Sequence, residues 1–130
     1  MNAASQDIKD QLVTAGLGLT FGTNLFIGRE PPKPNNSVTI YDTSGFGPEL
    51  TLDGNSGYEY PSIQIRIRNK TYQAGWTMAQ TIKDTLHGLS METINTTIYT
   101  VITCSSGPAF LDWDNEERVR FVINFNLQRR

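Results

Sequence analysis

The side chains best suited to chemistry are scarce in this chain of 130 residues. It holds one histidine, His87, and one cysteine, Cys104. A structural zinc site needs about four such ligands, so neither residue is expected to bind a metal. The sequence contains no Gly-x-Ser-x-Gly elbow, no Walker phosphate loop and no Gly-x-Gly-x-x-Gly motif. We therefore predict no catalytic residue, no cofactor and no metal, and we expect that the protein is not an enzyme.

Acidic side chains gather in one short segment, at Asp112, Asp114, Glu116 and Glu117. Oxygen ligands on a turn suit a cation, but this spacing fits no calcium-binding loop and Trp113 interrupts it. The simpler interpretation is a solvated turn whose acids pair with Arg118 or Arg120.

The arginines offer a second possibility, because two segments alternate apolar and polar residues. Residues 62–68 and 117–130 have apolar side chains at every second position. A period of two places alternate residues on opposite faces of a strand, so each strand has one face for a core and one for solvent. If the two strands are neighbours, four arginines line the polar face: Arg66, Arg68, Arg118 and Arg120. This face either provides solubility and cross-strand hydrogen bonds, or forms a wall past which a polyanion moves without being gripped.

The remaining pattern supplies the elements that position these residues. A helix is predicted over residues 71–89, with Gly75, Ala79, Ile82 and Leu86 on one face. A shorter helix begins near Ser5, and further strands are predicted at 24–28, 37–41 and 91–104, followed by turns at 105–108 and 109–118. The order predicts an α+β fold: a single domain over residues 1–130, with a mostly antiparallel β-sheet and two helices packed on one face.

A long loop at residues 43–58 has no periodicity, yet it contains several large apolar side chains. They are Phe46, Leu50, Leu52 and Tyr58. Long loops without structure of their own are usually functional. One interpretation makes these four residues a partner or subunit interface that orders on contact. The other folds the loop over the edge of its own domain.

Composition narrows the class of function. The net charge is −2 and charged residues make up only 18% of the chain, so tight binding of duplex DNA is not expected. Much of the surface must then be neutral and polar, which is compatible with packed assembly contacts. No apolar stretch approaches the length of a transmembrane helix and no signal peptide is evident, so we expect no membrane contact and synthesis in the cytoplasm.

Several segments together resemble a family of small tailed-bacteriophage proteins, the tail terminators or minor capsid (head-tail joining) proteins. The matching stretches are residues 26–31 (FIGREP), 37–42 (SVTIYD), 60–68 (YPSIQIRIR), the helix at 72–89 and 118–126 (RVRFVINFN). The resemblance implies a virion protein of the tail or neck that is assembled in the host cytoplasm. It implies a ring, commonly a hexamer, that ends growth of the tail tube and gives the head a docking surface.

The partners implied by this resemblance are other copies of the chain, the tail tube protein, a head-completion protein and, transiently, DNA passing through the channel. Two alternatives remain open. One is a head-completion or neck (connector) protein of a tailed phage, and the other is a small ligand-binding α+β domain.

Overall fold

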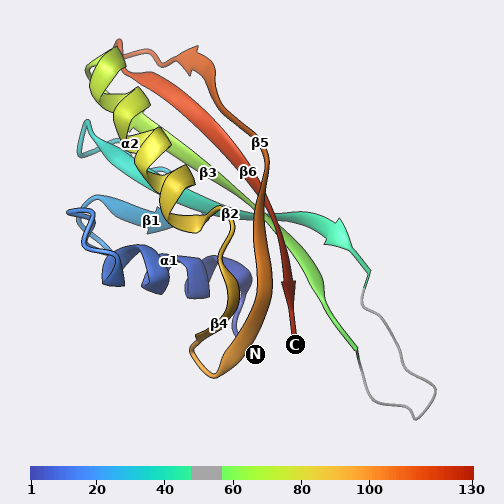
Figure 1. The fold of residues 1–130 in the computed structure, drawn as a ribbon. Coiled ribbons are helices and arrows are strands. Elements are labelled where there is room, and N and C mark those ends of the chain that lie inside the picture. Colours follow the sequence, from blue (N-terminus) through green and yellow to red (C-terminus); the bar gives the residue numbers. More distant parts are fainter. Residues whose placement is uncertain (48–56) are drawn as a thin grey trace.

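A computed structural model describes residues 1–47 and 57–130 of the chain. The elements follow the order α1 (Ala4–Thr14), β1 (Leu25–Ile27), β2 (Ser37–Phe46), β3 (Tyr60–Asn69), α2 (Tyr72–Leu86), β4 (Ser90–Ile94), β5 (Thr97–Trp113) and β6 (Val119–Arg129). The strands form one curled six-stranded sheet in the order β1-β2-β3-β6-β5-β4 (Figure 1). The pair β1–β2 is parallel and the other neighbouring pairs are antiparallel.

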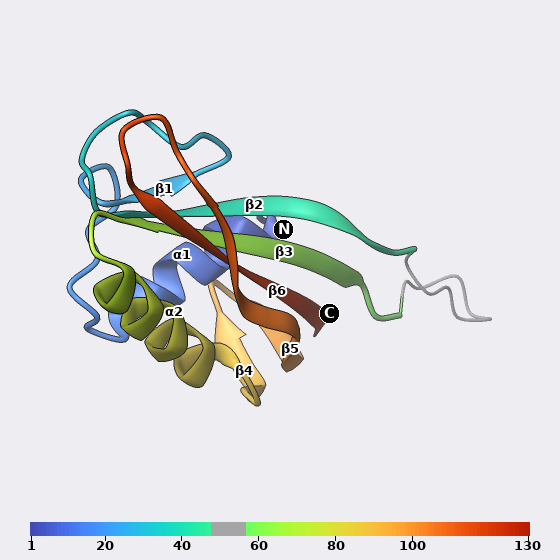
Figure 2. The ribbon, with the colours of Figure 1, turned by 90° about the horizontal axis from the view of Figure 1, so that it is seen from above.

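Both helices lie against the same face of this sheet (Figures 1 and 2). Helix α1 packs on β1, β2, β3 and β4, while α2 packs on β3, β5 and β6. The predicted α+β class, with a mostly antiparallel sheet and two helices on one face, is therefore confirmed.

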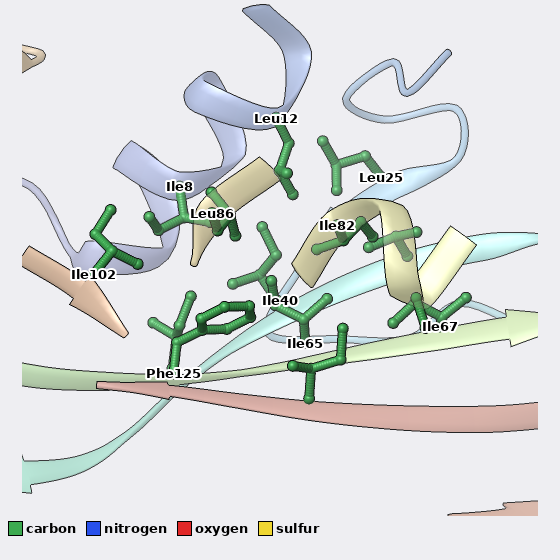
Figure 3. Packing of buried hydrophobic residues seen from close by; sticks show 14 of the residues in the cluster. Ile8, Leu12, Leu25, Ile40, Ile65, Ile67, Ile82, Leu86, Ile102 and Phe125 are labelled. Atoms are coloured by element: carbon green, nitrogen blue, oxygen red, sulfur yellow. The ribbon is translucent and has the colours of Figure 1, made fainter. Parts of the chain in front are cut away.

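The core forms where the alternating strands meet the helices. In β3 and β6 the odd-numbered residues from Ile63 to Ile67 and from Val119 to Leu127 are buried. Register places Ile65 of the central strand β3 between Ile40 and Ile123. The helices add Ile8 and Leu12 from α1 and Ile82 and Leu86 from α2 (Figure 3). Burial of this aliphatic layer drives the two helices onto one face.

The close approach of α2 to the sheet depends on Gly75. This residue is buried on the predicted face of the helix, together with Ala79. A Cβ atom added at Gly75 would lie 2.9 Å from Cε2 of Phe121 and 3.1 Å from Cβ of Asn69. A side chain at this position would therefore push the helix away from β6.

The strand predicted at 91–104 is wrong in its boundaries, because the chain turns back at Asn95 and Thr96. Both residues have positive φ, at 50° and 66°. The Asn95 side chain donates to Asp7 at 2.9 Å and to Asp10 at 2.7 Å, which fixes the turn against α1. The segment is thus divided into β4 and the start of β5.

The predicted turns at 105–108 and 109–118 are largely wrong, since β5 continues through them to Trp113. Strand β6 pairs with β5 over this whole stretch. Because β5 has more residues than the part of β6 that it faces, the register shifts twice between Cys104 and Ala109 and again between Phe110 and Asp112. Gly107, at φ 92°, takes a conformation that suits glycine. Only the turn between Trp113 and Val119 remains. Likewise β2 extends to Phe46, so the first part of the predicted loop at 43–58 is strand.

Candidate functional site

Two of the four predicted arginines lie beneath the proline-rich segment at residues 29–36 and not on an open face. Arg68 is 2% exposed, and its guanidinium lies 3.2 Å from Oε1 of Glu30 and donates to the carbonyl oxygen of Pro34 at 2.6 Å. Arg118 is 4% exposed and donates to the carbonyl oxygen of Pro32 at 2.6 Å. These carbonyls satisfy the buried guanidiniums, so Arg68 and Arg118 hold the segment in place.

Glu30 links this buried layer to the outer face. Its Oε1 lies 3.2 Å from Arg68 and 3.0 Å from Nη2 of Arg120, whose Nη1 is 3.2 Å from Asp112. Desolvation works to lower the pKa of Arg120, but the bonds to Glu30 and Asp112 outweigh it and raise that pKa. Glu30 thus joins Arg68 and Arg120, whereas Arg118 pairs with Asp114 and Arg66 donates to Gln64 outside this network.

The acidic segment forms the predicted turn with arginine partners. Asp114 accepts from the backbone N–H groups of Glu116 and Arg118, both at 2.9 Å, and from Nε of Arg118 at 2.7 Å. Burial acts to raise the pKa of Asp114, and these three donors together lower it below its ordinary value. Among the residues that the structure describes, no group of His, Cys, Asp and Glu side chains is arranged to hold a metal ion.

The sheet face opposite the helices carries a row of neutral polar side chains. Ser62 donates to Asn126 at 2.8 Å, and Gln64 donates to Asn124 at 3.1 Å. Arg66 closes the row by donating to Gln64 at 2.9 Å. Its guanidinium also lies 5.2 Å from the ring centroid of Tyr41. This face can present amides and hydroxyls to a partner with little fixed charge. The interpretation of the arginines as a channel lining stays a prediction.

The strands β2 and β3 extend past the two helices (Figures 1 and 2), and β6 stays beside β3 as far as the bridge between Glu59 and Arg129. We call Thr43–Phe46 with residues 58–62 the arm. At its far end Phe46 pairs with Tyr60 and is 77% exposed. Phe46 also borders an apolar hollow with Val101 and Leu127. Tyr58 lies two residues beyond Tyr60 at the same end, beneath the Arg130 guanidinium, which is 5.6 Å from the ring centroid. Two of the four predicted interface residues thus belong to the arm. Leu50 and Leu52 lie outside the described residues.

An exposed aromatic cluster stands at the other end of the sheet, and the sequence did not reveal it. Tyr72 from α2 lies 6.3 Å from Phe110 and 6.4 Å from Trp113, measured between ring centroids. All three are about half exposed and cover the buried ring of Phe121, 5.0 Å from Tyr72. We call Tyr72, Phe110 and Trp113 the aromatic cluster. Phe110 and Trp113 were assigned to a turn, so their alignment with the helix could be found only by following β5 to its end.

His87, Asp7 and Tyr99 make hydrogen bonds that hold elements of the fold together. His87 follows α2 and its Nδ1 accepts the backbone N–H of Cys104 at 2.9 Å, which ties the end of the helix to β5. Asp7, fully buried, accepts the hydroxyl proton of Tyr99 at 2.5 Å, and Tyr99 in turn accepts from Arg129 at 3.0 Å. Burial, followed by the bond to Asp7, raises the pKa of Tyr99. This network clamps α1 onto β5 and β6. None of the helices in the described ranges is long and apolar enough to cross a membrane.

The first similarity concerns the fold. The fold is similar to that of a chain in the solved structure "Virion of native gene transfer agent (GTA) particle", with a TM-score of 0.66 and 13% sequence identity. The similarity covers 98% of this chain and 94% of that chain, so the whole α+β architecture is shared.

The family follows from the sequence itself. The model of the bacteriophage tail terminator protein family matches residues 11–130, and the chain belongs to this family. It is therefore a structural protein of the phage tail and a component of the virion, as the resemblance implied. No curated protein sequence matches the chain.

Proposed function

We propose that this protein is a tail terminator that acts as a ring, with six copies, at the end of the tail tube. The ring covers the surface to which the next tube subunit would add, and it presents a new surface to the head. The family match over residues 11–130 carries this proposal. The mechanism is steric and needs no covalent chemistry.

The arm is the element best suited to make such a contact. Phe46, at 77% exposure, has a large apolar surface that is costly to leave in water. Buried aromatic residues usually dominate binding energy at interfaces. We propose that Phe46 and Tyr58, with Leu50 and Leu52 of the adjoining segment, anchor a subunit or tube contact.

The polar sheet face is proposed to line the channel through which DNA passes. Its hydrogen-bonded amides and hydroxyls offer no dense positive charge, and Arg120 is already paired with Glu30 and Asp112. Weak attraction suits passage of a polyanion, because many free cations would hold it. The protein would be assembled in the host cytoplasm and remain in the tail or neck, between the tube protein and a head-completion protein.

The first test removes the arm end. Replacing residues 46–57 with a short Gly-Ser link should leave the fold intact and abolish control of tail length. Electron microscopy of particles made with this variant should show overlong tails. Tails of normal length with attached heads would refute the role of this segment. Tails of normal length with unattached heads would indicate a head-completion or neck protein instead.

A finer test uses Gly45 of the arm and Gly47, which follows it. A Cβ atom at Gly45 would clash with the carbonyl oxygen of Tyr60, while a Cβ atom at Gly47 meets no atom of the described residues within 4 Å. Gly45→Ala should therefore displace Phe46 and disturb tail length, and Gly47→Ala should not. Equal tail lengths for both variants would show that the position of Phe46 does not matter.

A further inference from the structure

The aromatic cluster has the properties of a docking surface. Its side chains are 48% (Tyr72), 48% (Phe110) and 52% (Trp113) exposed, and Leu111 beside them is 39% exposed. Aromatic side chains can bury about 150–250 Å² each, so the three rings leave roughly 300 Å² of apolar surface in water. Exposed patches of this size on single proteins are often functional. The cluster is also firmly supported, because Phe121 and Trp76 pack edge to face beneath it, with their ring centroids 5.7 Å apart.

We propose that the aromatic cluster receives the arm of the next copy in the ring, an inference that rests on the proposed ring. The arm and the cluster lie at opposite ends of the molecule, since α2 begins at one end of the sheet and the arm leaves the other (Figures 1 and 2). Strand β3 joins the two ends with ten residues, a span of about 33 Å at about 3.3 Å per residue.

Two different apolar patches at opposite ends indicate a heterologous contact. Each copy then uses its arm on one neighbour and its cluster on the other, and a suitable rotation closes the series into a ring. A stable interface buries about 800 Å² on each partner, more than the cluster provides if it pairs with itself. Contact between cluster and arm adds Phe46, Tyr58 and the hollow beside Val101 to the buried surface.

The charges at the two rims are complementary. The turn that follows the cluster exposes Glu116, whose side chain is 64% exposed, and Glu117 next to it. Beside the far end of the arm Arg130 is exposed, and its guanidinium covers Tyr58. Opposite charges at a rim guide encounter and fix orientation, so they favour arm-to-cluster contact over cluster-to-cluster contact.

Strand addition is a poorer explanation for the same surface. Beyond Ser106, the strand neighbour of β5 within the described ranges is β6, so one edge is open to a partner. That edge is interrupted by register shifts on both sides of Ala109, and Pro108 has no N–H to donate. The side chains of the cluster, and not the backbone edge, are therefore the docking elements.

The experiment uses two variants, each of which damages one side of the contact. Trp113→Ser breaks the cluster and Phe46→Ser breaks the arm end, and each should weaken ring formation at least about 30-fold. A mixture of the two variants retains one intact contact, between the Phe46→Ser cluster and the Trp113→Ser arm. It should give 1:1 dimers and no larger ring in sedimentation or native mass spectrometry. Val13→Ser, an exposed apolar change on α1, is the matched control and should still form rings.

A second pair of variants avoids damage to the fold. Glu116→Arg and Arg130→Glu should each weaken the ring, and the double variant should recover most of the loss. Where rings form only on tail tubes, a Phe46→Cys/Trp113→Cys double variant in a Cys104→Ser background should give a ladder of disulfide-linked copies from purified tails.

The outcomes separate this inference from the proposed function. Rings of Trp113→Ser that are as stable as wild type, or a mixture that yields no dimer, would overturn the arm-to-cluster contact. Intact Trp113→Ser rings on overlong tails would assign the cluster to the tube protein instead. A ring on tails whose copies do not crosslink overturns the contact alone, while tails without any ring overturn the proposed function.

Discussion

Glu30→Gln tests whether the buried arginine network holds the proline-rich segment. In the wild-type protein a single oxygen, Oε1 of Glu30, lies 3.2 Å from Arg68 and 3.0 Å from Arg120. The other oxygen, Oε2, is buried without a hydrogen-bond partner in the described part of the chain. Glutamine removes the negative charge. If its NH₂ group takes the place of Oε2, that group has no acceptor among the described residues.

The expected loss follows from the burial of Arg68. Its side chain is 2% exposed, and that of Glu30 is 12% exposed, so water cannot replace the lost carboxylate. Breaking a buried ion pair on one side costs about 3–5 kcal/mol, because the remaining charge is left uncompensated. The carbonyl of Pro34 still accepts from Arg68, so we expect a loss of about 2–4 kcal/mol in the free energy of unfolding. For a chain of this size the melting temperature should fall by about 8–15 °C.

Urea unfolding, followed by circular dichroism at a concentration where the protein is monomeric, measures this loss. Glu116→Gln is the control, because its carboxylate is 64% exposed and 3.7 Å from Arg118, and it should change stability by less than about 0.5 kcal/mol. Combining Glu30→Gln with Arg68→Met should cost at least about 1 kcal/mol less than the sum of the single variants. Equal losses for Glu30→Gln and Glu116→Gln would refute the reasoning.

Two further predictions concern the turn after β5 and the contact of α2. Burial works to raise the pKa of Asp114, but the donors on Arg118 and Glu116 outweigh it and set that pKa below its ordinary value of 3.8. The ionised form of Asp114 therefore stabilises the fold above that pH, and the contribution disappears as pH falls through the lower value. Asp114→Asn should lower the free energy of unfolding by about 1–3 kcal/mol at pH 7. Below about pH 4 the stabilities of the variant and the wild type should converge, as measured by unfolding at a series of pH values. Gly75→Val should cost about 1–3 kcal/mol because its side chain would collide with Phe121, whereas Ala74→Val on the exposed side of the same helix should cost under about 1 kcal/mol in the same assay.

The elements with strong local patterns could be predicted from the sequence. The alternation in β3 and β6 fixed which residues enter the core, and the small residues Gly75 and Ala79 marked the face of α2 that meets the sheet. These signals are local, since period two or period 3.6 can be recognised within a single segment. The paired acids of the turn after β5 were also recognisable, because Asp114 and Arg118 are four residues apart.

The parts that could not be predicted depend on contacts between distant segments. Arg68 is buried because the carbonyl of Pro34, 34 positions earlier, lies over it. A period-two pattern shows only that Arg68 is not in the aliphatic layer, and it contains no information on what covers the other face. The bond between Asp7 and Tyr99 joins residues 92 positions apart and gives no local signal.

The long course of β5 has a similar cause. Its turn-forming residues are real signals, but β6 runs alongside as a continuous strand. Pairing with β6, through several register shifts in β5, outweighs the local preference for a turn. The consequence reaches the aromatic cluster. Phe110 pairs with Phe121 only because the strand continues, and this pairing brings Phe110 and Trp113 beside Tyr72.

The same strands that build the core also determine where the proposed contacts lie. Strand β3 contributes Ile63, Ile65 and Ile67 to the core and continues without a break into the arm, so the direction of the arm is fixed by the packed sheet. At the other end, the aromatic cluster stands on Phe121 of the neighbouring strand β6. Because Phe46 lies on β2 and the cluster lies on α2 and β5, these side chains are already positioned by regular secondary structure, and docking would cost little conformational entropy. In the proposed ring, the curvature of one sheet would then set the angle between successive copies, as closure with a defined number of subunits requires.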